Sequence, residues 1–317
     1  MPTQRQDMGP QHTAVPPAAV TAIGNKIEAW TEPSWHTTFE KASMNEHEDR
    51  FRLDRVAFFG RTLAEYLQMF AIGIDDLRGA RILDVASGPG SFVAEALALG
   101  LDATGCDPLY SQAAAEIVAR GRADIDACRQ QLRRKPGVLV YRDIDRFYSD
   151  KDAALAAFAA DFRRRQGACR YVAGALPSLP FPDASFDVVL SANFLLIYAP
   201  LADGGMHDGD DFGLDFHLRA FRDLARVTRR ELRVTGMHTW TQPPTPHPYR
   251  QPVVQALEQA GFAVTLVSSD YDDGCLAGGA HLPQVLVARR GPNGHHASRP
   301  SPASSKAVDS AGSSCET

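Results

Sequence analysis

Residues 82–92, Ile-Leu-Asp-Val-Ala-Ser-Gly-Pro-Gly-Ser-Phe, constrain the fold of this chain more than any other stretch. The largely apolar run 81–86 predicts a short buried strand, and the two glycines predict a tight turn. A helix is expected to begin at Ser91 or Phe92. A strand that turns on glycines into a helix presents free backbone N–H groups to a ligand. This corner therefore predicts a binding site for an anion or a cofactor.

A second strand-like run, residues 101–106, ends in Asp107, which stands nineteen residues after Gly88. In doubly wound α/β folds, a carboxylate at the tip of the second strand meets the two hydroxyls of a ribose. The two features together predict a nucleotide-like cofactor on a doubly wound sheet. The structural alternative for Asp107 is an N-cap for a helix that starts at Pro108.

Small differences around the corner separate the possible cofactors. A dinucleotide fingerprint, Gly-x-Gly-x-x-Gly, needs a third glycine where this chain has Val93. The spacing from Asp84 to the glycines instead resembles motif I of the class I S-adenosylmethionine-dependent methyltransferases, Asp-x-Gly-x-Gly-x-Gly. Ala86 replaces the first glycine, at little cost if its φ is negative. Taken alone, the motif is also compatible with an ordinary strand–turn–helix corner.

Further motifs follow in the order that this family has. The corner Leu-Pro-Phe at 179–181, the pair Phe186-Asp187 and the apolar run 188–190 resemble the entry to the family's fourth strand. The resemblance covers about residues 50–290 and extends to a group of uncharacterised bacterial methyltransferases. It implies an α/β fold with a Rossmann-like seven-stranded sheet in the order 3-2-1-4-5-7-6, with helices on both faces and a helical insertion after strand 2.

The predicted organisation has one large domain between two tails. Residues 1–30 and 291–317 are expected to be a disordered arm and tail, and residues 31–290 the methyltransferase domain. Within it, residues 46–78 are expected to form an N-terminal helical cap, and 111–169 the helical insertion. Helices are expected at 46–71, 111–134, 151–166, 214–228 and 250–260, and later strands at 170–173, 231–238, 262–268 and 283–289.

The composition of the chain limits which kinds of binding partner are expected. The chain has 317 residues and a formal net charge of −5, which argues against bulk nucleic-acid or acidic-membrane binding. The arginine clusters at 133–135 and 163–165 stand beside acidic residues, as solvated helix faces do. The chain has five scattered cysteines without a CxxC pair, and neither a signal segment nor a long apolar run is recognised in it. These features favour a reduced cytoplasmic protein.

The resemblance implies S-adenosylmethionine as cofactor and assigns its contacts residue by residue. Asp107 is expected to accept hydrogen bonds from the ribose hydroxyls, and Asp84 to act on the ammonium group of the methionine end. The family often has Asp where this chain has Ala175, so the adenine contact is expected from the backbone. The remaining residues expected at the cofactor are Arg61, Tyr66, Ala86, Ser87, Gly88, Gly90, Pro108, Leu109, Ala175, Leu176 and Asn193.

Catalysis is less constrained, because methyl transfer from a sulfonium needs mainly orientation and exclusion of water. Asn193 and His238 are the candidate catalytic residues, with His238 as a base for an oxygen or nitrogen acceptor on a small or medium-sized molecule. A structural role is the alternative for each. The stretch 207–211 is expected to be an acidic surface loop and not a metal site.

Two other functions remain open from the sequence. One is a non-catalytic methyltransferase-like module that binds a partner or acts as a scaffold. The other is a nicotinamide-dependent reductase, which Val93 and the absence of a Tyr-x-x-x-Lys pair near the corner disfavour.

Overall fold

The computed structural model describes residues 53–58, 60–134, 142–165, 169–241, 244–272 and 284–291. The described residues form a seven-stranded sheet whose order is β3-β2-β1-β4-β5-β7-β6. Its strands are β1 (Arg81–Val85), β2 (Asp102–Cys106), β3 (Tyr171–Val172), β4 (Phe186–Ser191), β5 (Thr228–Thr235), β6 (Phe262–Ser268) and β7 (Gln284–Arg290). The first five strands pair in parallel, while β7 is antiparallel to both neighbours. The predicted sheet order and fold class are confirmed.

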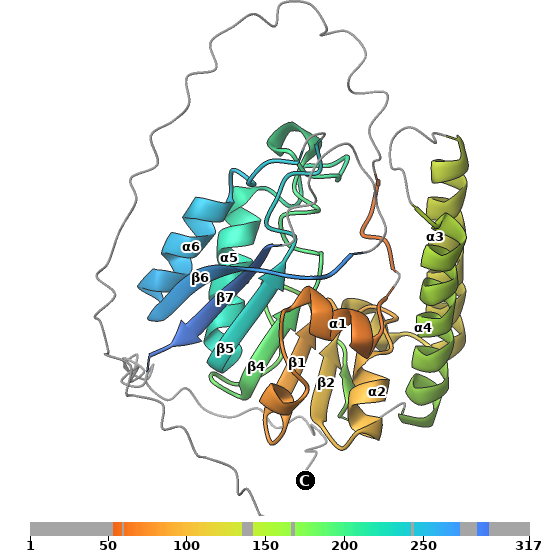
Figure 1. Ribbon diagram of the computed structural model, residues 1–317, viewed down its shortest axis with the longest axis horizontal. Helices are drawn as coiled ribbons and strands as arrows, with labels where there is room; N and C mark the ends of the chain where they lie inside the picture. The colour runs from red at the N-terminus through yellow and green to blue at the C-terminus, as the bar shows by residue number, and fades with distance from the viewer. Residues whose placement is uncertain are drawn as a thin grey trace, which may run out of the picture. The chain divides into compact units, whose positions relative to one another are not determined.

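The described residues also form six α-helices and three short 3-10 helices (Figure 1). The α-helices are α1 (Leu63–Met69), α2 (Phe92–Ala98), α3 (Ala114–Arg134), α4 (Ile144–Arg165), α5 (Leu214–Val227) and α6 (Arg250–Gln259). The 3-10 helices are η1 (Asp75–Leu77), η2 (Pro108–Ser111) and η3 (Leu201–Asp203). The long helices α3 and α4 both come from the connection between β2 and β3, where the sequence predicts an insertion.

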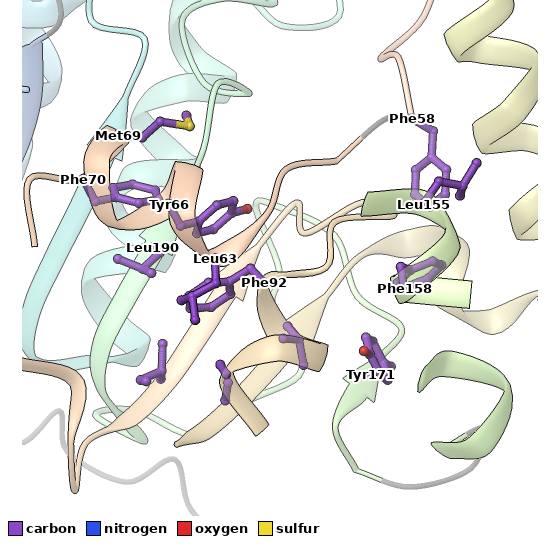
Figure 2. Close-up of a cluster of buried hydrophobic side chains, with 14 of the residues drawn as sticks. Phe58, Leu63, Tyr66, Met69, Phe70, Phe92, Leu155, Phe158, Tyr171 and Leu190 are labelled. Atoms are coloured by element: carbon purple, nitrogen blue, oxygen red, sulfur yellow. The ribbon is translucent and has the colours of Figure 1, made fainter. Parts of the chain in front are cut away.

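Alternating side chains of the central strands supply two separate cores. Ile82 and Val188 contribute to the core under α1 and α2, while Leu83 and Val189 contribute to the core under α5 and α6. Figure 2 shows part of the first core, in which Tyr66 of α1 lies against the ring of Phe92. Strands buried on both faces explain the uninterrupted apolar runs of the sequence.

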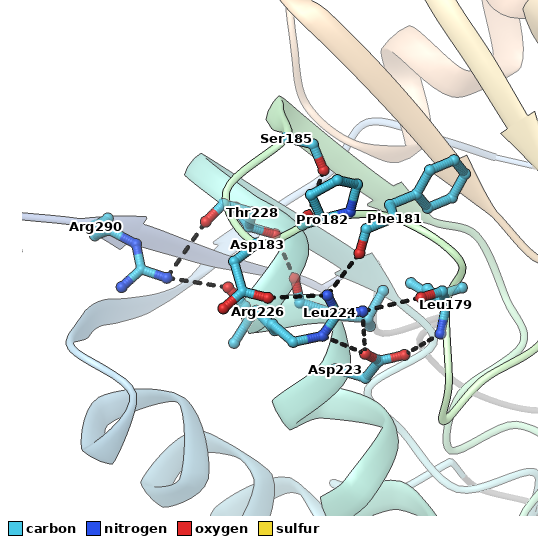
Figure 3. A network of polar contacts seen from close by, with 11 residues as sticks. Leu179, Phe181, Pro182, Asp183, Ser185, Asp223, Leu224, Arg226, Thr228 and Arg290 are labelled. Carbon is cyan, nitrogen blue, oxygen red and sulfur yellow. Dashed lines mark hydrogen bonds and ion pairs between the residues drawn. The ribbon is translucent and has the colours of Figure 1, made fainter. Parts of the chain in front are cut away.

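A network of hydrogen bonds and ion pairs around Arg226, called here the Arg226 clamp, holds the corner that leads into β4 (Figure 3). Its guanidinium donates hydrogen bonds to the carbonyls of Leu179 and Phe181 at 3.0 and 2.6 Å, and it pairs with Asp223 and Asp183 at 2.8 and 3.0 Å. The clamp lies at the end of α5 and fixes the Leu-Pro-Phe corner recognised in the sequence.

Two predicted elements are wrong in extent. Residues 53–58 and 60–62 are not helical, so the helix expected at 46–71 reduces to α1, with residues 46–52 outside the described part. The strand expected at 231–238 is β5, which ends at Thr235 because Gly236 takes a left-handed φ of 80°. His238 therefore lies in the following loop.

The remaining helices agree with expectation within a few residues, except that α4 begins at Ile144, seven residues before the predicted start at 151. The domain boundaries stay predictions, since the expected arm at 1–30 and nearly all of the expected tail lie outside the described residues. Cys106 and Cys128 are free and buried, but Cys169 is disulfide-bonded, against the expectation of reduced cysteines. In the described part of the chain, no helix has the length and apolarity needed to cross a membrane.

Candidate functional site

The glycine turn lies where β1 ends and α2 begins. Gly88 has a φ of 57°, a left-handed conformation that glycine adopts at little cost. Ala86 also has a positive φ, 56°, which contradicts the expectation that this residue costs little. An alanine in this conformation costs roughly 1–2 kcal/mol. The fold therefore retains a strained residue within the turn, as functional sites often do.

Asp107 joins the tip of β2 to this turn. Its Oδ2 accepts a hydrogen bond from Gly88 N–H at 3.1 Å, and its Oδ1 accepts one from Leu109 N–H at 3.0 Å. The second bond is the N-cap of η2, so the structural role considered for Asp107 is present. Burial raises the pKa of Asp107 to about 6, although both backbone hydrogen bonds lower it.

Tyr110, in η2, holds the other side of the turn. Its hydroxyl donates a hydrogen bond to the Gly88 carbonyl at 2.6 Å, and its ring packs at 5.4–5.8 Å from Phe158, Phe162 and Tyr171. Both the N–H and the C=O of Gly88 are therefore fixed by groups that follow β2. The sequence did not predict a role for Tyr110, whose only signal is its position three residues after Asp107.

Asp84 lies near the end of β1, beside the turn, and is 1% exposed. It accepts hydrogen bonds from the Ser87 hydroxyl at 2.6 Å and from the Tyr66 hydroxyl at 3.1 Å. Burial, and to a smaller extent the negative charge of Asp107, raise its pKa to about 7, while the two hydroxyl donors oppose the shift. No cation contributes to this pKa among the described residues. Within the described ranges, Asp84 is thus a buried carboxylate that no cationic side chain pairs with.

The segment before α1 crosses directly over the glycine turn. A Cβ on Gly60 would lie 2.1 Å from the backbone N and Cα of Gly90, so the two glycines are in backbone contact. The Arg61 carbonyl accepts a hydrogen bond from Ser91 N–H at 3.0 Å. Arg61 therefore lies at the turn, and Tyr66 reaches it through Asp84, while the contact with the cofactor expected of both residues stays a prediction.

A buried ion pair ties the helical insertion to this region. Lys151 of α4 is 0% exposed, and its Nζ lies 2.6 Å from Glu65 Oε1 in α1. Glu65 also completes a capping box with Thr62, accepting its backbone N–H at 2.8 Å. The sequence Thr-x-x-Glu at 62–65 signals this cap, whereas nothing in the sequence signals the partner Lys151.

The predicted adenine-contacting segment lies next to Asp107. Gly174 N–H points at the Asp107 carbonyl at 3.4 Å, and the following residues, Ala175 and Leu176, are exposed and half-buried. Leu109 is half-buried and Pro108 exposed on the other side of Asp107. The residues expected to contact adenine, Leu109, Ala175 and Leu176, thus lie on two segments that follow the ends of β2 and β3 and that the contact between Gly174 and Asp107 joins.

The candidate catalytic residues lie beyond the ends of β4 and β5. Asn193 has a left-handed φ of 47°, its backbone N–H donates to the Thr235 hydroxyl at 2.9 Å, and its Oδ1 accepts from that hydroxyl at 2.7 Å. His238 is half-buried and pairs with Pro246 in an isolated bridge. Asn193 is thus fixed against the end of β5.

The acidic stretch 207–211 forms part of the same edge. His207 is 5% exposed, and its Nε2 lies 3.8 Å from Asp211 Oδ2, too far for a hydrogen bond. In the ranges that the structure describes, no three His, Cys, Asp or Glu side chains are grouped as ligands of one metal ion would be.

Comparisons with known proteins find similar sequences and similar folds. The profile of a family described as a methyltransferase domain matches residues 144–206, from α4 to just beyond η3. The match, together with the sheet order and the carboxylates at the turn, confirms the resemblance predicted from the sequence. The chain is similar to class I methyltransferases. An uncharacterized protein of Methanocaldococcus jannaschii is 27% identical over 189 residues, which are 57% of this chain and 78% of that protein.

Solved structures with a similar chain path include three methyltransferases. A possible histamine N-methyltransferase of Thermotoga maritima is 13% identical, with a TM-score of 0.34 over 71% of this chain and 88% of its own. The magnesium protoporphyrin IX methyltransferase of Synechocystis PCC 6803 with bound SAM is 12% identical, with a TM-score of 0.34 over 72% and 90%. A didemethyltoxoflavin N1-methyltransferase of Burkholderia thailandensis with S-adenosylhomocysteine is 14% identical, with a TM-score of 0.37 over 72% and 78%. Similarity at this level says nothing about a substrate.

Proposed function

We propose that this protein binds S-adenosylmethionine at the glycine turn and transfers its methyl group to an oxygen or nitrogen atom of a small or medium-sized acceptor. The observation that carries the proposal is the pair of buried carboxylates, Asp84 and Asp107, on either side of one glycine turn. The bound cofactor would supply a methyl group on a sulfonium, which is already a good leaving group.

The donor set of this corner fits the cofactor. Asp84 is buried without a cation among the described residues, and an ammonium group from a ligand would supply the missing charge. Asp107 accepts one backbone N–H on each oxygen, and a carboxylate has about four lone-pair positions. It therefore keeps one position on each oxygen for the two hydroxyls of a ribose.

The residues beyond β4 and β5 would orient the acceptor. Asn193 is held in a left-handed conformation by Thr235, so its side-chain amide has a fixed place at the end of the sheet. His238 lies in the loop after β5, where an imidazole would take a proton from an acceptor that needs a base. Half-buried aromatic side chains, Phe194, Phe212 and Phe216, pack together near Asn193 and would help to exclude water.

The test is a calorimetric titration of the full chain with S-adenosylhomocysteine and with S-adenosylmethionine. We expect saturable binding with a dissociation constant in the micromolar range for both. No binding below millimolar concentration would rule out the proposal. Incubation with methyl-labelled S-adenosylmethionine and a mixture of small phenols, acids and amines then separates the alternatives, because a non-catalytic scaffold would bind the cofactor without moving the label to any acceptor.

A further inference from the structure

A second polar site lies near the amino ends of β1 and β5, at the opposite edge of the sheet from the glycine turn. A pocket at this place takes its walls from the segment after α1, from η1, and from strands β5 and β7. The lining residues are Ile72, Asp76, Arg230, Glu231, Arg233 and Arg289. Three arginines and two carboxylates leave the pocket with one net positive charge.

Arg233 forms the buried part of this pocket and is 6% exposed. Its Nη1 donates hydrogen bonds to the carbonyls of Phe70 and Ala71 at 2.6 and 2.8 Å, and its Nε donates to Glu231 Oε1. Among the described residues, no acceptor meets its Nη2. The guanidinium is therefore fixed in position while one of its donors stays available at the pocket.

Glu231 neutralises the arginines only in part. Its Oε2 accepts from Arg289 Nε at 2.6 Å, so both Arg233 and Arg289 approach it through Nε. The two terminal nitrogens of Arg289 meet no acceptor within the part of the chain that the structure describes, and its side chain is 57% exposed. A second acceptor, brought by a ligand, would complete these hydrogen bonds.

A β-bulge brings the third arginine to the pocket. The register of β5 shifts between the pairs Phe186–Thr228 and Val188–Glu231, so two residues of β5 stand opposite Asp187. Arg229 pairs with Asp187, whereas Arg230 points toward the Asp76 carbonyl at 3.5 Å. Bulges redirect side chains in this manner, and this one places Arg230 beside Arg233 and Arg289.

We propose that this pocket binds a phosphate group, carried by inorganic phosphate or by a small phosphate ester. Planar guanidinium groups match phosphate oxygens in pairs, and a doubly charged phosphate would suit a pocket with three arginines better than a singly charged carboxylate does. The pocket shares no residue with the glycine turn, so the proposal does not rest on methyl transfer.

Calorimetric titration of the full chain with inorganic phosphate at constant ionic strength tests the site. We expect saturable binding with a dissociation constant on the order of millimolar, and weaker binding of acetate. Arg230→Gln and Arg289→Gln should each weaken phosphate binding at least fivefold, because each removes a charged donor. Arg219→Gln, an exposed arginine of α5 paired with Asp215, is the matched control and should leave binding unchanged.

The outcomes separate cleanly. The proposal is overturned if binding does not saturate up to about 20 mM phosphate, because the dissociation constant would then lie well above the millimolar range. It is also overturned if all variants bind phosphate equally, which would indicate an adventitious ion only. Glycerol phosphate as a second probe distinguishes a site open to esters from one that takes free phosphate. If Arg230→Gln fails to fold, Arg230→Lys keeps the charge, loses the planar fork and should still weaken binding. Binding of S-adenosylhomocysteine, measured in the same samples, should be unaffected.

Discussion

The hydroxyl of Tyr66 lies 3.1 Å from each carboxylate oxygen of Asp84 and donates to that carboxylate. The two residues belong to α1 and β1, so this contact joins the helix before the sheet to the carboxylate of the glycine turn. The Tyr66 ring stacks on Phe92 of α2, with centroids 4.5 Å apart, which fixes the direction of the hydroxyl. Tyr66 thus favours the charged form of Asp84, as the Ser87 hydroxyl also does.

Tyr66→Phe should raise the pKa of Asp84 above its present value of about 7, because the hydroxyl stabilises the charged form. We expect weaker binding of S-adenosylhomocysteine near neutral pH and a loss of about 1–2 kcal/mol in the free energy of unfolding. Calorimetry and urea denaturation measure the two effects. Tyr171→Phe, which removes a buried hydroxyl bonded to Asp161, is the control and should affect stability alone.

Affinity for S-adenosylhomocysteine should rise with pH between 6 and 8. A ligand ammonium group favours the charged form of Asp84, whose pKa of about 7 leaves it mostly protonated at pH 6. The expected gain is about tenfold, measured by titration in buffers of one ionic strength. Asp84→Asn should bind weakly and lose most of this pH dependence. A flat profile for the unaltered chain would contradict the assigned role of Asp84.

The contribution of Asp84 and Asp107 to the stability of the ligand-free protein should fall as pH rises from about 4 to about 7, whereas His247, whose pKa burial lowers to about 4, contributes in the opposite direction over part of this range. Asp84 and Asp107 have folded pKa values of about 7 and about 6, above the ordinary value of 3.8, so the folded state binds more protons than the unfolded state in this window. Their favourable contribution is complete below about pH 4 and disappears as pH passes the folded pKa values. Urea denaturation at several pH values measures this effect as the difference in unfolding free energy between the unaltered chain and Asp84→Asn, and the unaltered chain should lose stability relative to the variant as pH rises.

Asp107→Asn should weaken binding of S-adenosylhomocysteine by tenfold to a few hundredfold. The change removes charge-assisted hydrogen bonds to two hydroxyls, each contributing roughly 1.5–3 kcal/mol. Asp102→Asn, at the exposed start of the same strand, is the matched control and should bind normally. Equal affinity in the two variants would place the ribose somewhere other than at β2.

Gly60→Ala should disrupt the glycine turn, because the added Cβ would overlap the backbone of Gly90. We expect a loss of about 2 kcal/mol or more in the free energy of unfolding, together with weaker cofactor binding. The control is Gly291→Ala, where nothing lies within 4 Å of the added carbon. Thermal unfolding compares the two, and a normal melting temperature for Gly60→Ala would contradict the close packing described.

The parts of the fold that depend on local pattern could be predicted from the sequence. The apolar runs gave the central strands, and the glycine corner placed Asp84 and Asp107 on one edge of a parallel sheet. The helix that apolar spacing predicts across residues 53–58 and 60–62 does not form. There, Leu53 N–H donates to the Met206 carbonyl and Phe58 N–H to Asp124, so tertiary partners take the hydrogen bonds that a helix would need.

Partners distant in the chain could not be predicted. Tyr66 was expected near the cofactor, but its bond to Asp84 depends on how α1 packs on the sheet. The contact between Lys151 and Glu65 joins residues 86 positions apart, and no local signal reports it. The strain at Ala86 was missed for a similar reason, since the sign of φ follows from the loop's surroundings and not from the motif.

The contact between the Arg61 carbonyl and Ser91 N–H bears on which ligands this corner can select. In dinucleotide enzymes, the start of the corresponding helix attracts pyrophosphate with its unsatisfied N–H groups. Here a carbonyl already accepts one of them, and two carboxylates stand beside the turn. With one N–H of the helix start already accepted by a carbonyl and the buried Asp84 carboxylate beside the turn, we expect this corner to bind a diphosphate less well than the corresponding corner of a dinucleotide enzyme does.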